Sequence, residues 1–212
     1  MSADGHSARY LSVASQLALA VDPALIDSMA VGLAELRDRG GRLFVLGVGG
    51  GAGHASHAVN DFRKLCNIES YAPTDNVSEL TARTNDDGWD TSLVRCLEVS
   101  RLGPADGIMV FSVGGGSREH GVSVNLVNAM ERAHELGASI YGVVGSRHGT
   151  LALLADVAVV IEPPADLKTP LVESFQAVVW HALVSHPALA VQEGHWETLA
   201  SGTTEPSRLS SL

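Results

Sequence analysis

The sequence predicts an α/β protein whose parallel sheet is covered by helices on both faces. Short apolar runs alternate with segments whose apolar residues recur every three or four positions, as in strands and helices. Most of the short runs are apolar without interruption, which indicates strands buried on both sides. With 212 residues, 45% of them hydrophobic, the chain suits one domain with a well-buried core. We divide this single domain, 1–212, into N-terminal helices (7–39), an α/β core (42–187) and a tail (188–212).

Two helices precede the first strand. Apolar residues between Ser7 and Leu19 recur at helical spacing. Asp22 and Pro23 are typical of the start of the second helix, which Gly40 can end. The α/β core requires neither helix. They therefore pack either over the sheet or against another subunit.

The first strand–loop–helix unit is the most informative segment. The apolar run Leu43–Leu46 predicts a buried strand, and a loop with five glycines follows it. Glycines at the start of a helix let a ligand approach the backbone, and the free amides there favour an anion. The helix that follows carries His57 and Asp61, four positions apart and so on one face.

The remaining elements alternate in the same way. Four further strands are expected at 71–72, 107–112, 139–144 and 157–161. Helices are expected at 76–83 (with Asp75 as its cap), 91–101, 122–136, 151–154 and 169–186. A polar turn is predicted at 84–88, and the last ~10 residues have the composition of a disordered tail.

A second glycine loop follows the strand at 107–112. It holds two hydroxyls, Ser112 and Ser117, around three glycines, which suits a phosphate monoester. The alternative is a tight turn that needs glycine for its backbone angles. A nicotinamide cofactor is disfavoured because Glu69, the acidic residue at the expected distance, precedes a strand instead of ending one. The first loop is not a Walker nucleotide-binding loop either, because no Gly-Lys-Ser/Thr follows it.

Two helices pair an imidazole with a carboxylate. His57 and Asp61 lie one turn apart, and Glu173 and His181 lie eight positions apart on the last helix, roughly on one face. Such groups can hold a divalent metal such as zinc or act as acid and base. The spacing alone leaves both possibilities open.

Composition excludes several classes of partner. The net charge of −10 argues against nucleic acid, and no apolar stretch approaches the ~20 residues of a membrane span. Cys66 and Cys96 stand in no metal or redox motif, so we expect two buried free thiols and a reducing compartment. These features predict a cytoplasmic protein with a small-molecule ligand.

The chain resembles the sugar isomerase (SIS) domain family and, within it, the phosphoheptose isomerases, over about residues 7–187. The resemblance lies in five features in order: the first glycine loop, the His57–Asp61 helix, Asn85–Asp86, the Ser112–Ser117 loop and the Glu173–His181 helix. It implies a three-layer αβα sandwich with a flavodoxin-like, five-stranded parallel sheet. It also implies a homotetramer joined in part by the N-terminal helices.

The resemblance assigns roles by position. Asp61 corresponds to the catalytic base and His181 to a catalytic histidine. The ligands implied for a divalent metal, zinc by preference, are His57, Asp61, Glu173 and His181. The residues implied to bind the sugar phosphate are Gly50, Gly51, Asn85, Asp86, Ser112, Gly114, Gly115, Gly116, Ser117 and Glu173.

The implied reaction converts sedoheptulose 7-phosphate to D-glycero-D-manno-heptose 7-phosphate through an enediol, with metal assistance. Four departures indicate a divergent branch: Asp61 replaces a glutamate, Glu173 a glutamine and Gly51 a serine, and the second loop lacks a hydroxyl and an asparagine that the family has. The alternatives are an isomerase for a related ketose phosphate and a non-catalytic regulatory module that only binds a sugar phosphate. The intact acid/base set argues against the regulatory module.

Overall fold

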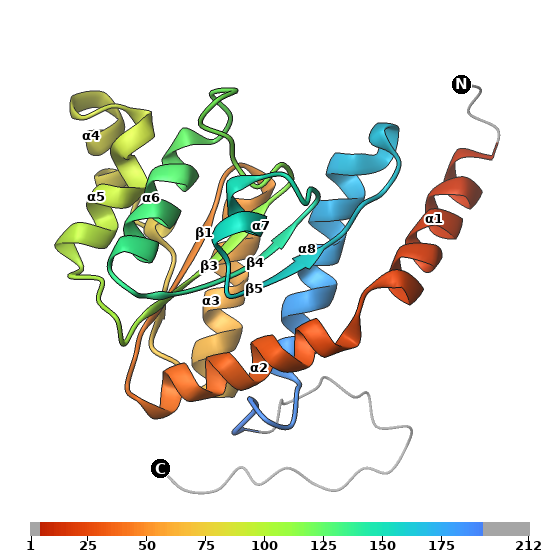
Figure 1. Cartoon of the computed structure of the whole chain (residues 1–212), viewed down its shortest axis with the longest axis horizontal. Helices are drawn as coiled ribbons and strands as arrows, with labels where there is room; N and C mark the ends of the chain where they lie inside the picture. Colours follow the sequence, from red (N-terminus) through yellow and green to blue (C-terminus); the bar gives the residue numbers. More distant parts are fainter. Residues whose placement is uncertain (1–4, 193–212) are drawn as a thin grey trace, which may run out of the picture.

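The protein, described here for residues 5–192 from a computed structural model, is built on a five-stranded, wholly parallel sheet (Figure 1). The strands lie in the order β2-β1-β3-β4-β5. Their bounds are β1 Leu43–Gly47, β2 Ser70–Tyr71, β3 Gly107–Ser112, β4 Ser139–Val144 and β5 Val157–Val160. This order is that of flavodoxin-like folds. The predicted fold class is therefore confirmed.

Helices cover both faces of the sheet and complete the three layers (Figure 1). One face carries α2 (Pro23–Asp38), α3 (Gly50–Cys66) and α8 (Lys168–Val184). The other carries α5 (Ser92–Val99), α6 (Val124–Glu135) and α7 (Thr150–Leu154). The remaining helical elements are α1 (His6–Ala20), α4 (Val77–Asp86) and the short 3₁₀ turns η1 (Pro73–Asp75), η2 (Trp89–Thr91) and η3 (Ala165–Leu167).

The core is divided into two apolar clusters by the sheet. Met109 and Phe111 of β3 point to the α2, α3 and α8 side, while Ile108 and Val110 point to the α5 and α6 side. This alternation is the period of two expected for a strand covered on both faces. Phe62 of α3 is fully buried in the first cluster, so α3 is held firmly against the sheet.

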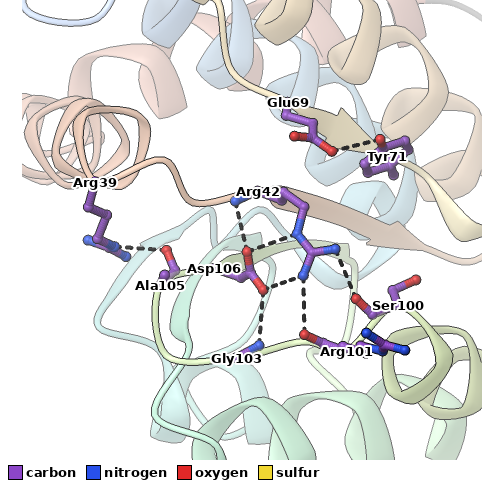
Figure 2. A network of polar contacts seen from close by, with 9 residues as sticks. All are labelled: Arg39, Arg42, Glu69, Tyr71, Ser100, Arg101, Gly103, Ala105 and Asp106. Atoms are coloured by element: carbon purple, nitrogen blue, oxygen red, sulfur yellow. Dashed lines mark hydrogen bonds and ion pairs between the residues drawn. The ribbon is translucent and has the colours of Figure 1, made fainter.

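A partly buried ion pair, with Asp106 buried and Arg42 28% exposed, joins the amino ends of β1 and β3 (Figure 2). The Arg42 guanidinium donates to both carboxylate oxygens of Asp106, at 3.1 and 2.8 Å, and to the carbonyls of Ser100 and Arg101. The Arg42 backbone N–H and the Gly103 N–H also donate to Asp106. The network links β1 and β3 at their amino ends, opposite the carboxyl ends where ligands bind in such sheets.

Some predicted boundaries are wrong by a few residues. The second strand begins at Ser70, one residue early. The helix predicted from residue 76 is capped by Asn76, not Asp75, because the Asn76 side chain accepts from the Glu79 N–H. That helix continues to Asp86, so part of the predicted polar turn at 84–88 is helical. The disorder predicted for the last residues lies outside the described residues.

The first helix stands apart from the sheet. None of the residues of α1 is buried, although Ala14 and Leu17 pack against the core cluster. Its polar contacts include the Arg9–Asp166 ion pair and the Tyr10–Ser174 hydrogen bond. Figure 1 shows it projecting beyond α8. Within residues 5–192, no single helix has the length and apolar composition to cross a membrane, although α1 and α2 taken together pass that test as a bent pair.

Both cysteines are free and buried, as predicted. Burial raises the pKa of the Cys66 thiol to about 12 and that of the Cys96 thiol to about 11. At neutral pH both sulfurs therefore remain protonated and unreactive.

Candidate functional site

The two glycine loops meet at one point of the sheet edge. They follow β1 and β3, which are adjacent strands although a crossover separates them in sequence. In a 2-1-3-4-5 sheet the crevice beyond the carboxyl ends of these two strands is where ligands bind. The topology thus brings together the two loops that the sequence identified separately.

A cavity of ≈220 Å³ occupies this crevice. The lining residues come from both loops and from α6 and α8: Val48, Gly51, Phe111, Ser112, Val113, Gly114, Val122, Ser123, Leu126, Glu173 and Gln176. Four residues predicted to bind the sugar phosphate are among them, namely Gly51, Ser112, Gly114 and Glu173. Ser123, Phe111 and Gln176 carry no sequence motif and were not anticipated.

The second loop is shaped by its glycines and by Ser112. The Ser112 hydroxyl accepts a hydrogen bond from the Gly115 N–H at 3.0 Å. Gly115 and Gly116 have φ of 79° and 77°, a left-handed conformation that favours glycine. These two glycines turn the chain behind the lining residues, so they support the cavity wall without lining it.

Besides Gly50, Gly115 and Gly116, three further predicted substrate-binding residues lie outside the cavity lining. Ser117 pairs through its backbone with Val122, and its hydroxyl lies 2.9 Å from Nδ1 of His120 on the exposed loop. Asn85 and Asp86 lie in the last turn of α4, where the Asn85 side chain donates to Asp86. In this single chain they take no part in the crevice.

Glu173 lies at the amino end of α3. A Cβ placed on Gly50 would stand 2.7 Å from the Glu173 carboxyl carbon, so glycine leaves room for the carboxylate to lie against the backbone here. A carboxylate here is favoured by the positive end of the α3 dipole. Both residues belong to the predicted substrate site, and the structure places them in contact.

His57, Asp61 and His181 converge between α3 and α8, further along both helices from the crevice. Asp61 Oδ2 lies 3.5 Å from His57 Nε2 and 3.6 Å from His181 Nε2. The Asp61 side chain is 12% exposed, and both imidazoles are about half exposed, at 56% and 54%. His181, more than a hundred positions away in the sequence, thus joins His57 and Asp61 in one cluster. The imidazole side of this cluster is open to solvent.

Trp180 supports this cluster from the core. It is 2% exposed, and its indole Nε1–H donates to Asp61 Oδ2 at 3.1 Å. Its ring packs against both imidazoles, with centroid separations of 5.3 Å to His57 and 4.7 Å to His181. Trp180 is preceded by three apolar residues, which gave no sign in the sequence of a polar role.

The donor set fits a divalent metal. One ligand atom from each of the three residues lies within 4.8 Å of the other two. Zinc bonds of about 2.0–2.2 Å in a tetrahedron separate ligand atoms by about 3.3–3.6 Å, close to the two distances measured from Asp61. Three protein ligands leave one position for a substrate oxygen, as in catalytic zinc sites.

Glu173 does not join the predicted metal ligands in the described chain. Eight residues of helix rise by about 12 Å, so Glu173 and His181 lie at different levels of α8. Glu173 instead stands beside Gly50 in the crevice. Its position removes the close carboxylate pair with Asp61 that a four-ligand site would contain.

A larger cavity of ≈360 Å³ lies between β1, β2 and α5. Its one arginine, Arg42, already uses all three guanidinium nitrogens within the network of Figure 2. Its carboxylate, Glu79, is paired with Arg83. The crevice near Ser112 therefore remains the better candidate for chemistry.

Comparison with known proteins places the chain among relatives of known name. No family model matches the chain. The chain is 37% identical over 171 residues to the lincomycin biosynthesis protein LmbN of Streptomyces lincolnensis, covering 76% of this chain and 62% of that protein, less than two thirds of its length. It is 30% identical over 167 residues to the phosphoheptose isomerase of Rhodospirillum rubrum, covering 76% and 82%.

A solved structure supports the same grouping at the level of fold. The phosphoheptose isomerase of Neisseria gonorrhoeae superposes with a TM-score of 0.74 over 85% of this chain and 94% of that one, at 22% sequence identity. The fold is therefore shared almost throughout the neighbour's length.

Proposed function

From its membership of the phosphoheptose isomerase family of SIS-domain proteins, we propose that the chain interconverts a ketose phosphate and an aldose phosphate. It is thus an isomerase. The substrate we propose is sedoheptulose 7-phosphate, converted to D-glycero-D-manno-heptose 7-phosphate. The observation that carries the proposal is the convergence of His57, Asp61 and His181 beside a crevice built from two glycine loops.

The crevice would hold the phosphate end of the sugar. The Ser112 hydroxyl and the backbone of Gly114 line it, and the amino end of α6 begins beside it at Ser123. Hydroxyls, free amides and a helix start are suited to a phosphate. Gly115, Gly116 and Ser117 would contribute by holding this loop in shape.

The three-residue cluster would carry the proton transfers. Asp61 takes a proton from the carbon next to the ketose carbonyl, and His181 gives a proton to the carbonyl oxygen, so that a cis-enediol forms. The reverse transfers then take place at the neighbouring atoms: His181 removes a hydroxyl proton and Asp61 returns the first proton to the other carbon. The aldose is released with no net change in atoms.

The same three residues, His57, Asp61 and His181, would hold the metal. Because a group bound to a metal is a poorer acid or base, Asp61 and His181 would move protons with the metal displaced from them. When bound, a divalent cation such as zinc polarises the carbonyl and the adjacent hydroxyl and stabilises negative charge on their oxygens. Trp180 keeps the Asp61 carboxylate in place, because its indole N–H donates to Oδ2. Glu173 accepts hydrogen bonds from sugar hydroxyls in the crevice instead of binding the metal.

We further propose a homo-oligomer, a tetramer, that acts in the cytoplasm. Leu11 and Leu19 of α1 are 67% and 87% exposed in the single chain, which supports burial of this helix against another subunit. Two buried, unreactive thiols are compatible with a reducing compartment.

Turnover is the direct test. The purified protein is incubated with sedoheptulose 7-phosphate, with and without added zinc, and the aldose product is followed. We expect turnover that depends on Asp61 and is lost in Asp61→Asn. Tight binding of the sugar phosphate without any turnover would instead support a non-catalytic binding module.

A further inference from the structure

Gln176 is a buried polar residue for which the proposed mechanism has no role. It is 0% exposed and lines the crevice from α8. Its Oε1 lies 2.8 Å from Nδ1 of His54. Its amide nitrogen is buried without a hydrogen-bond partner among the described residues. Because buried polar groups are nearly always paired, an unpaired amide on a residue that lines a cavity points to a partner that is absent here.

The position of Gln176 follows from the way α3 and α8 pack. The two helices run side by side in the same direction, so that contacts between them fall at three successive levels. Gly50 meets Glu173 at the crevice, His54 meets Gln176 next, and Asp61 meets Trp180 and His181 last. Gln176 therefore stands between the phosphate end of the proposed site and its proton-transfer end.

We propose that Gln176 binds an oxygen in the middle of the sugar chain, and that His54 orients its amide for this contact. This inference rests on the proposed function. Glu173 lies one turn before Gln176 on α8 and lines the same crevice. A carboxylate that accepts and an amide that donates together match a hydroxyl, which does both. The ligand class is thus a polyhydroxylated phosphate, as distinct from bare phosphate.

His54 acts as a positioning residue in this arrangement. In the tautomer that carries its proton on Nδ1, His54 donates to the Gln176 oxygen 2.8 Å away, which leaves the amide nitrogen on the other side. The imidazole itself is fixed by packing against Trp180, with ring centroids 5.2 Å apart.

The test substitutes Gln176 by methionine, which keeps the length and removes the amide. We expect Gln176→Met to raise the KM for sedoheptulose 7-phosphate about tenfold, with kcat changed less than threefold. The inhibition constant of inorganic phosphate should stay constant, because phosphate has no carbon chain. The Tm should stay or rise, because a buried unpaired group is removed. His54→Phe should shift KM in the same direction, and His54→Gln, which keeps an N–H donor, should restore part of it.

Asn125 provides the matched control. Its side-chain nitrogen is also buried and unpaired among the described residues, but it does not line the crevice. Asn125→Leu should change Tm without changing KM. An unchanged KM in Gln176→Met, or a parallel rise of KM and the phosphate inhibition constant, would overturn the inference.

Calorimetry separates this inference from the proposed function. If the wild type binds sedoheptulose 7-phosphate without turnover, the isomerase proposal fails. The ratio of dissociation constants of Gln176→Met and wild type then still decides the role of Gln176, with tenfold expected and unity contradicting it. If the wild type binds no sugar phosphate, both are overturned.

Discussion

Asp61 is the most constrained carboxylate of the site. Its Oδ2 accepts from Trp180 and faces two imidazoles, while its Oδ1 accepts from the Asn60 side chain at 3.1 Å. The carboxylate is thus fixed before any ligand arrives. Fixing a reacting group in this way removes the cost of orienting it during the reaction.

Trp180→Phe should therefore lower kcat clearly and change the free energy of unfolding only slightly. The phenyl ring keeps most of the packing, but the hydrogen bond to a charged group, typically about 1.5–3 kcal/mol, is lost. We expect kcat to fall at least tenfold with KM nearly constant, measured in the turnover assay. Trp89→Phe, at a tryptophan that is 40% exposed, is the control and should match the wild type. Equal kcat values for both variants would show that Trp180 has only a packing role.

At the scale of elements, a metal would tie α3 to α8. His57 and Asp61 belong to one helix and His181 to the other, so an ion held by all three bridges elements that are distant in sequence. Because the unfolded chain brings no such site together, binding stabilises the folded state by linkage, about 2.7 kcal/mol at a hundredfold excess over Kd.

We expect about one divalent ion per chain, zinc by preference, in protein purified without chelator. His57→Ala should abolish binding and lower Tm, as measured by elemental analysis and thermal unfolding. Glu173→Gln is the matched comparison, since Glu173 lies apart from the cluster, and it should keep the stoichiometry. A metal content that is lost in Glu173→Gln would restore the four-ligand site predicted from the sequence.

The Arg42–Asp106 network makes a pH-dependent contribution to stability. Burial alone would raise the pKa of Asp106, but hydrogen bonds from the Arg42 side chain, the Arg42 N–H and the Gly103 N–H together hold it below its usual value. A carboxyl with a lower pKa in the folded state stabilises the fold above the unfolded pKa, about 4. That stabilisation is lost as pH falls through the folded pKa.

Asp106→Asn should cost about 3 kcal/mol in the free energy of unfolding at pH 6, near the lower end for breaking a buried pair. Urea denaturation from pH 6 to pH 3 should show the difference from wild type shrinking below about pH 4. The exposed Arg37–Asp38 pair offers a control, and Asp38→Asn should cost well under 1 kcal/mol. A pH-independent difference for Asp106→Asn would contradict the electrostatic explanation.

At the scale of the whole molecule, the sequence predicted the five strands and both glycine loops, and it singled out His57, Asp61 and His181, which the structure places side by side. These predictions depend on periodicity, on glycine spacing and on the family resemblance, all of which can be identified from the sequence alone. Glu173 stands beside Gly50, apart from these three residues in the single chain, because a shared helix face does not specify the distance along the helix axis. Gln176 and Trp180 were missed because their roles arise only from the packing of α8 on α3.

Assembly is the main prediction at this scale. The exposed leucines of α1 should be covered in an oligomer, so light scattering at micromolar concentration should give the mass of a tetramer. The double variant Leu11→Glu and Leu19→Glu should form smaller species, while Leu153→Glu, at another leucine that is 74% exposed, should not. A monomeric wild type would contradict this prediction.

The parallel packing of α3 and α8 also makes the site select its substrate by the length of the carbon chain. His57 stands two turns below Gly50, so the two ends of the site are separated by about 10 Å along the helix axis. A ketose phosphate held by its phosphate at one end must have enough carbons to bring its carbonyl to the other. Pentulose phosphates, which are two carbons shorter than sedoheptulose 7-phosphate, should then behave as competitive inhibitors that turn over poorly. A pentulose phosphate with the same kcat as the heptulose would show that the two ends are not used together.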